Sequence, residues 1–296
     1  MELAELRMKA AAGDAEAQYD IACILFDGER VKKNKKEAAQ WYLKAAKQGH
    51  ILAQETMGWA YHDGWGVKEN QEKAIHWYRE AANQGSTVAQ RELAELVSDE
   101  DPEDAASLYQ LAAEAGDAQA QFKLAEFYER GKGIPKNDDE AFRWYLSAEQ
   151  QAEADDVFLG LGANVSYEVG RCYATGQGVQ KNSDEALKRL LPIADPKITE
   201  DPWLMSRAQI WVVTVFADPE HVKHDLVEAY AWLNLAAAYA PTGQEFFGIM
   251  SRESAAEFRD TLGIRLSKEQ LNQAQLRSKE LFIPRQKIDK RLGRKP

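Results

Sequence analysis

A recurring aromatic dipeptide constrains the fold of this chain more than any other feature of its sequence. Trp41-Tyr42 is followed by three similar pairs and one weaker version, each with an alanine three positions earlier. The later pairs are Trp77-Tyr78, Leu108-Tyr109, Trp144-Tyr145 and Trp232-Leu233, and Ala186 holds the alanine column before Arg189-Leu190. The alanines are spaced by 36, 31, 36, 45 and 43 residues, which indicates six copies of one repeat between residues 15 and 240.

Each copy has the pattern of two helices joined by a glycine turn. A glycine ends the first helix in four copies, as a left-handed terminal position requires: Gly28, Gly64, Gly131 and Gly176. A second glycine precedes an apolar anchor at Gly66, Gly133 and Gly178. Short polar residues that suit the start of the second helix follow at Asn34, Asn70, Asn137, Asn182 and Asp225. Because no long segment alternates with the period of a strand, the sequence predicts an all-α chain.

Helical spacing then separates core from surface. The first helices carry an apolar stripe, formed by Ala17, Ile21 and Leu25 in the first copy and by Ala53, Met57 and Tyr61 in the second. Beside the stripe runs a column of small residues that lets helices approach closely: Ala22, Gly58, Ala125 and Gly170. Since the aromatic pairs recur once per copy, we interpret them as wedges between helices rather than as ligand-binding aromatics.

These residues resemble the Sel1-like repeats, which are relatives of the tetratricopeptide repeats. The second copy matches the family pattern at Ala53, Met57, Gly58, Tyr61, Gly64, Gly66, Val67, Asn70, Ala74, Trp77, Tyr78, Ala81, Ala82 and Gly85. The third copy lacks the glycine turn, and the sixth keeps only the second half of the pattern. The resemblance implies a right-handed α-solenoid of about six repeats that serves as a binding scaffold.

Four segments follow from this arrangement. Residues 1–14 form an N-terminal capping segment, and residues 15–240 form the repeat solenoid with an insertion at about 150–163. Residues 241–283 form C-terminal capping helices, of which the second begins at a capping box of Ser267 and Gln270. Residues 284–296 form a basic tail. The two cysteines, Cys23 and Cys172, lie several repeats apart and are expected not to pair.

Aromatic and arginine side chains at outward positions of the first helices are the candidate partner-binding residues, because these residue types anchor interfaces. They are Tyr19, Trp59, Phe122, Tyr167 and Arg171, and Phe158 in the insertion joins them. The alternative for the helical positions is packing against neighbouring helices, and for Tyr19 against a cap formed by residues 3–12. The alternative for the insertion is a lengthened helix followed by a loop.

The charge pattern narrows the classes of partner. The chain carries 48 acids and 37 bases, a net charge of −11, so general nucleic-acid binding is disfavoured. The basic tail has the charge to bind nucleic acid or an acidic partner, but we expect it to fold back on the acidic body or to stay disordered. No apolar stretch has the length of a membrane span and no secretory signal precedes the repeats, so we expect a cytoplasmic chain, or a periplasmic one if a signal segment has been removed.

Candidate chemistry is sparse. Asp218, His221, His224 and Asp225 form the one cluster with the composition of a metal site, but it falls in a turn where Asp225 has a capping role. We therefore expect no cofactor and no enzymatic activity, with a metal-dependent enzyme or a tail-mediated nucleic-acid binder as alternatives. The sequence predicts a monomeric scaffold that binds a partner protein on its concave surface, as an adaptor or regulator, or as an immunity-type inhibitor of a toxic effector enzyme.

Overall fold

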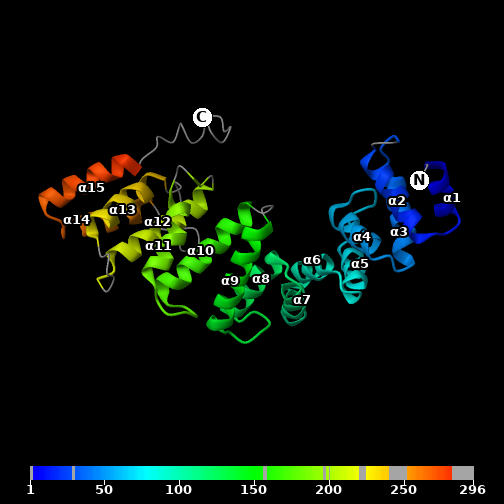
Figure 1. The fold of residues 1–296 in the computed structure, drawn as a ribbon, viewed down its shortest axis with the longest axis horizontal. Coiled ribbons are helices and arrows are strands. Elements are labelled where there is room, and N and C mark those ends of the chain that lie inside the picture. Colours follow the sequence, from blue (N-terminus) through cyan, green and yellow to red (C-terminus); the bar gives the residue numbers. More distant parts are fainter. Residues whose placement is uncertain are drawn as a thin grey trace. The chain divides into compact units, whose positions relative to one another are not determined.

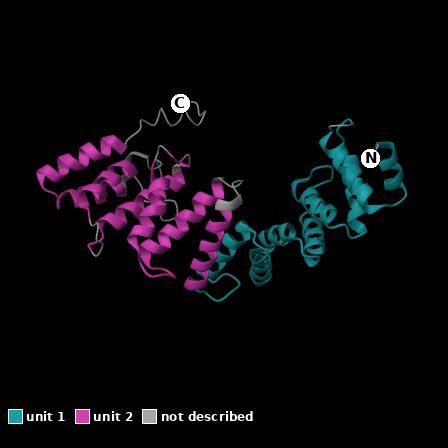
Figure 2. Cartoon of the chain, viewed as in Figure 1, with its two compact units in different colours: residues 1–137 teal, residues 138–296 magenta. Residues whose placement is uncertain are grey.

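The computed structural model describes residues 3–28, 31–155, 159–195, 198–199, 201–219, 225–239 and 252–281 of the 296-residue chain. These residues form fifteen α-helices, and the described ranges contain no β-strand (Figure 1). The chain divides into two compact units, residues 1–137 and residues 138–296 (Figure 2). Among the described helices, none has the combination of length and apolar content needed to cross a bilayer. The predicted all-α repeat fold is confirmed.

The first unit is a succession of helices in which each packs against the next. Its helices are α1 (Leu3–Ala11), α2 (Ala15–Asp27), α3 (Lys35–Lys47), α4 (Ile51–Asp63), α5 (Gln71–Asn83), α6 (Thr87–Val97), α7 (Pro102–Glu114) and α8 (Ala118–Arg130). Helix α1 packs on α2 and buries Leu6 and Ala10. Helices α2 and α3, α4 and α5, and α6 and α7 are the helix pairs of the first three repeats.

The second unit continues the same succession and adds two helices after the last repeat. Its helices are α9 (Asp138–Asp155), α10 (Leu159–Thr175), α11 (Ser183–Ala194), α12 (Pro202–Ala217), α13 (Leu226–Tyr239), α14 (Arg252–Gly263) and α15 (Lys268–Leu281). Both α14 and α15 pack against α13, as expected of terminal capping helices. The capping box is confirmed, because the Ser267 amide donates to Gln270 Oε1 at 2.9 Å and the Gln270 amide donates to Ser267 Oγ at 3.2 Å.

The insertion between the fourth and fifth repeats lengthens the helices on both sides of it. Helix α9 has 18 residues and α10 has 17, whereas α2, α3, α4 and α5 have 13 each. The lengthened helix that the sequence left as an alternative therefore reaches Asp155. Phe158, the proposed apolar tip of the insertion, lies outside the described residues.

Helix ends are set by the residues that the repeat pattern singled out. Gly28, Gly64 and Gly131 each follow a first helix with φ between 67° and 76°, the left-handed region that suits glycine. Gly66 is required for a second reason, since a Cβ there would lie 2.3 Å from the carbonyl oxygen of Lys35. The Asn70 side chain caps α5 by accepting a hydrogen bond from the Lys73 amide at 2.8 Å.

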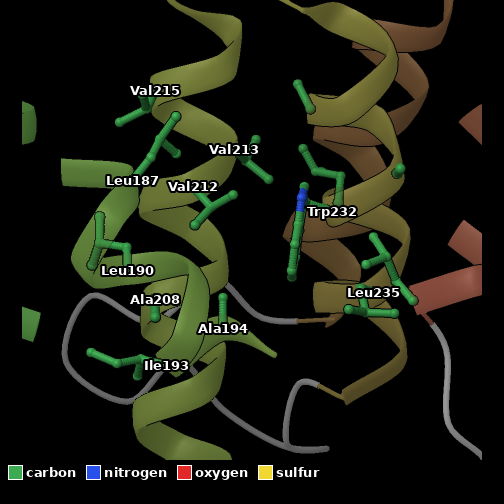
Figure 3. Packing of buried hydrophobic residues seen from close by; sticks show 14 of the residues in the cluster. Leu187, Leu190, Ile193, Ala194, Ala208, Val212, Val213, Val215, Trp232 and Leu235 are labelled. Atoms are coloured by element: carbon green, nitrogen blue, oxygen red, sulfur yellow. The ribbon is translucent and has the colours of Figure 1, made fainter. Parts of the chain in front are cut away.

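The core follows the predicted columns. The tyrosines of the aromatic pairs are buried in the first four repeats: Tyr42, Tyr78, Tyr109 and Tyr145. The column of small residues leaves room for these rings, because a Cβ on Gly58 would lie 2.5 Å from the Tyr78 ring. In the second unit α12 packs between α11 and α13, with Val212 and Val213 between Leu187 and Trp232 (Figure 3). The aromatic pairs are therefore packing elements, as predicted, although Trp41 and Trp144 are only half-buried.

Two of these tyrosines differ in one respect that makes a paired test. The Tyr109 hydroxyl donates to Glu95 Oε2 at 2.6 Å, whereas the buried Tyr78 hydroxyl has no hydrogen-bond partner within the described chain. We expect Tyr109→Phe to lower the free energy of unfolding by about 1 kcal/mol and Tyr78→Phe to leave it unchanged or raise it. Urea denaturation of both variants tests this, and equal losses would contradict the assigned hydrogen bonding.

Candidate functional site

The outward face of the first helices was the predicted binding surface, and in the first repeat its side chains are already engaged. The Tyr19 ring stacks on His50 with the centroids 4.7 Å apart and the planes at 19°. The Tyr42 hydroxyl donates to Cys23 Sγ at 3.2 Å, and the Phe26 ring lies 4.7 Å from the ring of Trp65. Burial, together with the neighbouring Cys23, raises the pKa of Tyr19 to about 12. Packing against neighbours, the alternative left open by the sequence, therefore describes Tyr19.

In the second repeat, apolar side chains on the outward face are exposed to solvent. Trp59 of α4 is 46% exposed, although it occupies the column that holds the half-buried Cys23 one repeat earlier. Leu52 lies two turns before it on the same helix and is 49% exposed, and Ile51 is also exposed. Because positions i and i+7 share one face of a helix, Leu52 and Trp59 form an apolar strip on α4.

The stretch of chain that carries this strip is acidic. Residues 51–117, which contain α4 to α7, carry 14 aspartates and glutamates against four lysines and arginines. Two of the four bases are neutralised locally: Arg79 pairs with Asp104 at 2.7 Å, and Arg91 pairs with Glu92 at 2.6 Å and with Asp117 at 3.3 Å. The stretch of chain that contains the exposed tryptophan therefore carries an excess of negative charge.

Outward acids of the second and third repeats are held in place by hydrogen bonds. The Ser86 hydroxyl donates to Glu55 Oε1 at 2.5 Å, and the Tyr109 hydroxyl positions Glu95 on α6. In the fourth repeat Phe122 is half-buried, and Glu126 pairs with Lys123 at 3.3 Å and Arg130 at 3.2 Å. Of the predicted aromatic anchors in the first unit, Trp59 is thus the one whose side chain lies largely in solvent.

The predicted outward placement of Tyr167 is wrong. Its side chain is 3% exposed and belongs to the core of the second unit. The Trp211 Nε1–H donates to the Tyr167 hydroxyl at 2.9 Å, and the Arg207 guanidinium lies 4.3 Å from the ring centroid. Both covering residues belong to α12 of the next repeat. Spacing along α10 could not indicate this, because the contact depends on side chains about 40 residues later.

The Arg171 side chain on α10 is only 14% exposed and is tied to its neighbours. Its Nε donates to Glu168 Oε2 at 2.6 Å and its Nη1 donates to Gln177 Oε1 at 2.6 Å. Glu168 also pairs with Arg207 at 3.3 Å, so these charges form one network over the Tyr167 ring. The network leaves Arg171 less available to a partner than its outward position predicts.

The proposed metal cluster has structural explanations for its two aspartates. Asp218 pairs with Lys181, and Asp225 caps α13 by accepting from the amides of Val227 at 2.9 Å and Glu228 at 3.1 Å. His221, His224 and the basic tail lie outside the described residues. Neither cysteine forms a disulfide.

One recurring polar column escaped the sequence analysis. A buried glutamine on each of five first helices donates its side-chain amide to a carbonyl at the end of the preceding second helix or, in the first repeat, of α1. The bonds run from Gln18 to Ala10, Gln54 to Ala46, Gln90 to Ala82, Gln121 to Ala113 and Gln209 to Ala194, at 3.0 to 3.4 Å. The recurring Ala-Gln dipeptide was the available signal. The column joins successive repeats and satisfies carbonyl oxygens at helix ends.

The chain is similar to one known protein family and to solved structures of that family. The model of the family described as Sel1 repeat matches residues 15–50, 51–86, 88–117, 118–152, 164–188 and 218–238. A Sel1 repeat protein from Oxalobacter formigenes is similar at a TM-score of 0.63 and 27% identity, covering 79% of this chain and 91% of that one. The search of curated proteins found no match.

A second solved structure supports the fold alone. A protective antigen present in uropathogenic Escherichia coli strains, described as displaying an SLR fold, is similar at a TM-score of 0.52 and 23% identity. The likeness covers 97% of this chain and 65% of the antigen.

Proposed function

This chain belongs to the Sel1 repeat family, and from that premise we propose that it is a scaffold that binds a basic partner protein on the outward face of α4 and the neighbouring first helices. Repeats of this family are protein-interaction scaffolds, so a partner protein is the expected ligand. The observation that supports this particular surface is the exposure of Trp59 in an acidic stretch of chain.

The exposed tryptophan supplies affinity. Tryptophan is among the residues most enriched at interface hot spots, and its removal from such a position typically costs 2 kcal/mol or more, about 30-fold in affinity. Leu52 extends the apolar area on the same face of α4. Both side chains would be removed from water when a partner covers the strip. Tyr19 and Phe26 are already packed against neighbours, so a partner would remove less of their area from water.

The acidic excess selects the partner. Lysine- or arginine-rich surfaces are attracted to residues 51–117, while nucleic acids are repelled. Because such attraction acts mainly between exposed charges, it weakens as salt is added. The strip of Trp59 and Leu52 then fixes where a basic partner sits.

The same surface serves either of two roles. An adaptor or regulator would hold a component of an assembly, and an immunity-type inhibitor would hold and block a toxic effector enzyme. In both roles the chain binds without turnover. The identity of the captured protein separates them, because an effector enzyme bound in one-to-one stoichiometry indicates the inhibitor and several assembly components indicate the adaptor.

Affinity capture from cell extract with the intact chain as bait tests the surface. We expect Trp59→Ala to lower the recovery of a captured basic protein by at least about 10-fold. Phe258→Ala is the matched control, since Phe258 is a similarly exposed aromatic residue on α14 of the other unit. Both variants should melt within about 2 °C of the unmodified chain, because neither side chain is in the core.

Two further readings decide the outcome. Release of the captured protein by 500 mM salt is expected from the charge argument. A captured partner with an acidic surface would contradict the proposed surface. Equal recovery of the captured protein with Trp59→Ala and with Phe258→Ala would contradict it as well.

A further inference from the structure

The second unit contains a groove of about 770 Å³, whereas the proposed interaction surface belongs to the first unit. Its lining comes from α10, α11 and the start of α12, together with Ile198 and Thr199 before α12 and Glu149 of α9. The lining residues are Glu149, Gly160, Gly162, Ala163, Asn164, Ser166, Lys188, Arg189, Pro192, Ile193, Ile198, Thr199, Asp201 and Leu204. Its volume is in the range of sites that bind ligands.

The groove forms where the chain departs from its repeat. Helix α10 begins at Leu159, whereas the repeat match of the fifth copy begins at residue 164. The connection from Asp195 to Asp201 lies between the repeat matches 164–188 and 218–238. Gly160, Gly162 and Ala163 of the first segment line the groove, as do Ile198, Thr199 and Asp201 of the second. Regular stacking of helix pairs does not require either of them.

Two glycines in the wall are not required by any contact with the described residues. Gly160 and Gly162 lie in the first turns of α10, and a Cβ on either would meet no atom within 4 Å. Gly58 and Gly170, by contrast, are required by contacts with Tyr78 and Leu190. A glycine in the middle of a helix costs about 0.5–1 kcal/mol relative to alanine, and glycine is the residue used where backbone approaches a ligand closely. Gly160 and Gly162 both line the groove, so they leave its wall open to such an approach.

The charges in the groove leave one cation available. Arg189 is bound by Glu149 at 3.0 and 3.1 Å and by Glu185, and Asp201 Oδ1 accepts from the amides of Trp203 and Leu204. Lys188 is exposed, and its charge acts on Glu185, which Arg189 already binds. Its ammonium group and the positive end of the α10 dipole both favour a carboxylate.

Apolar surface continues beyond the groove. Pro192, Ile193 and Leu204 line it, and Ile198 at its edge is 63% exposed. Trp203, next to Leu204 in sequence, is 47% exposed. A ligand that covers these side chains must extend past the groove, as a peptide does and a compact metabolite does not.

We propose that this groove is a second binding site, which takes a short segment of a partner protein with a carboxylate side chain beside an apolar one. The segment lies with its backbone along Gly160 and Gly162, its carboxylate near Lys188, and its apolar side chain against Ile193 and Ile198. This site is independent of the basic partner proposed for the first unit.

Selection of random twelve-residue peptides displayed on phage, with the full chain as target, tests the site. We expect enrichment of sequences with aspartate or glutamate next to leucine, isoleucine or phenylalanine. The affinity of an enriched peptide, labelled with fluorescein and measured by anisotropy, should fall at least about 10-fold for the double variant Gly160→Leu/Gly162→Leu and about 3- to 10-fold for Lys188→Ala.

The controls separate binding from folding and from the other surface. Gly160→Leu/Gly162→Leu should melt no lower than the unmodified chain, because leucine forms helices better than glycine. Lys268→Ala and Asn272→Leu on α15 match the charge removal and the added apolar side chain, and should not change the affinity. Trp59→Ala should not change it either, so this site and the proposed surface on α4 fail or succeed separately.

Three results would overturn the proposal. The first is that selection on the unmodified chain enriches no peptides beyond those enriched on the Gly160→Leu/Gly162→Leu variant, and the second is that it enriches basic peptides. The third is that Lys188→Ala binds the enriched peptide as tightly as the unmodified chain does. Lys188→Ala keeps the test decisive if the glycine variant fails to fold, since Lys188 is exposed and outside the core.

Discussion

Tyr167→Ala is expected to lower the free energy of unfolding of the second unit by about 3–5 kcal/mol, the usual cost of removing a large buried aromatic side chain. Tyr167 is 3% exposed and packs among residues of α11 to α13. Its removal leaves a cavity and deprives the Trp211 indole N–H of its acceptor. It also removes the ring on which the Arg207 guanidinium rests. Urea denaturation followed by circular dichroism at 222 nm measures the loss.

Two matched variants give this result its meaning. Tyr167→Phe keeps the ring and loses only the hydroxyl acceptor, so we expect a loss of about 1 kcal/mol. Trp59→Ala removes a larger side chain from an exposed position and should change the free energy of unfolding by no more than about 0.5 kcal/mol. A loss for Tyr167→Ala as small as that for Trp59→Ala would show that Tyr167 is a surface residue, as its spacing predicted.

Alkaline pH is expected to unfold the first unit through its buried tyrosines. Burial raises the pKa of Tyr42, Tyr78 and Tyr109 in the folded chain, with the hydrogen bond to Glu95 adding to the effect at Tyr109. An unfolded tyrosine loses its proton near pH 10, while the folded residues keep theirs. The resulting stabilisation is complete below pH 10 and is lost as the pH rises toward the folded pKa. Each tyrosine contributes a slope of about 1.4 kcal/mol per pH unit.

The measurement is a pH titration from 8 to 12 with two signals. Tyrosinate absorbance at 295 nm from the buried rings should rise together with the loss of helicity at 222 nm. Full ionisation of all eleven tyrosines near pH 10 with helicity intact would contradict the assigned burial.

The sequence by itself determined the helix pairs, their ends and most of their core. Gly64 and Asn70 act through hydrogen bonds and dihedral angles within a few residues, so their roles can be deduced locally. Tyr78 and Gly58 belong to columns that recur with the repeat, and recurrence separates packing residues from binding residues. The Ser267 capping box is local in the same sense.

Only the tertiary structure decided which outward residues face solvent. Tyr19, Trp59 and Tyr167 occupy equivalent faces of their helices or adjacent columns, yet one is stacked on His50, one is exposed and one is covered by Trp211. The helical period places a side chain on a face, but the side chains of the next repeat decide what covers that face. The groove beside Gly160 and Gly162 could not be predicted for a similar reason, because part of its lining comes from residues outside the repeat matches.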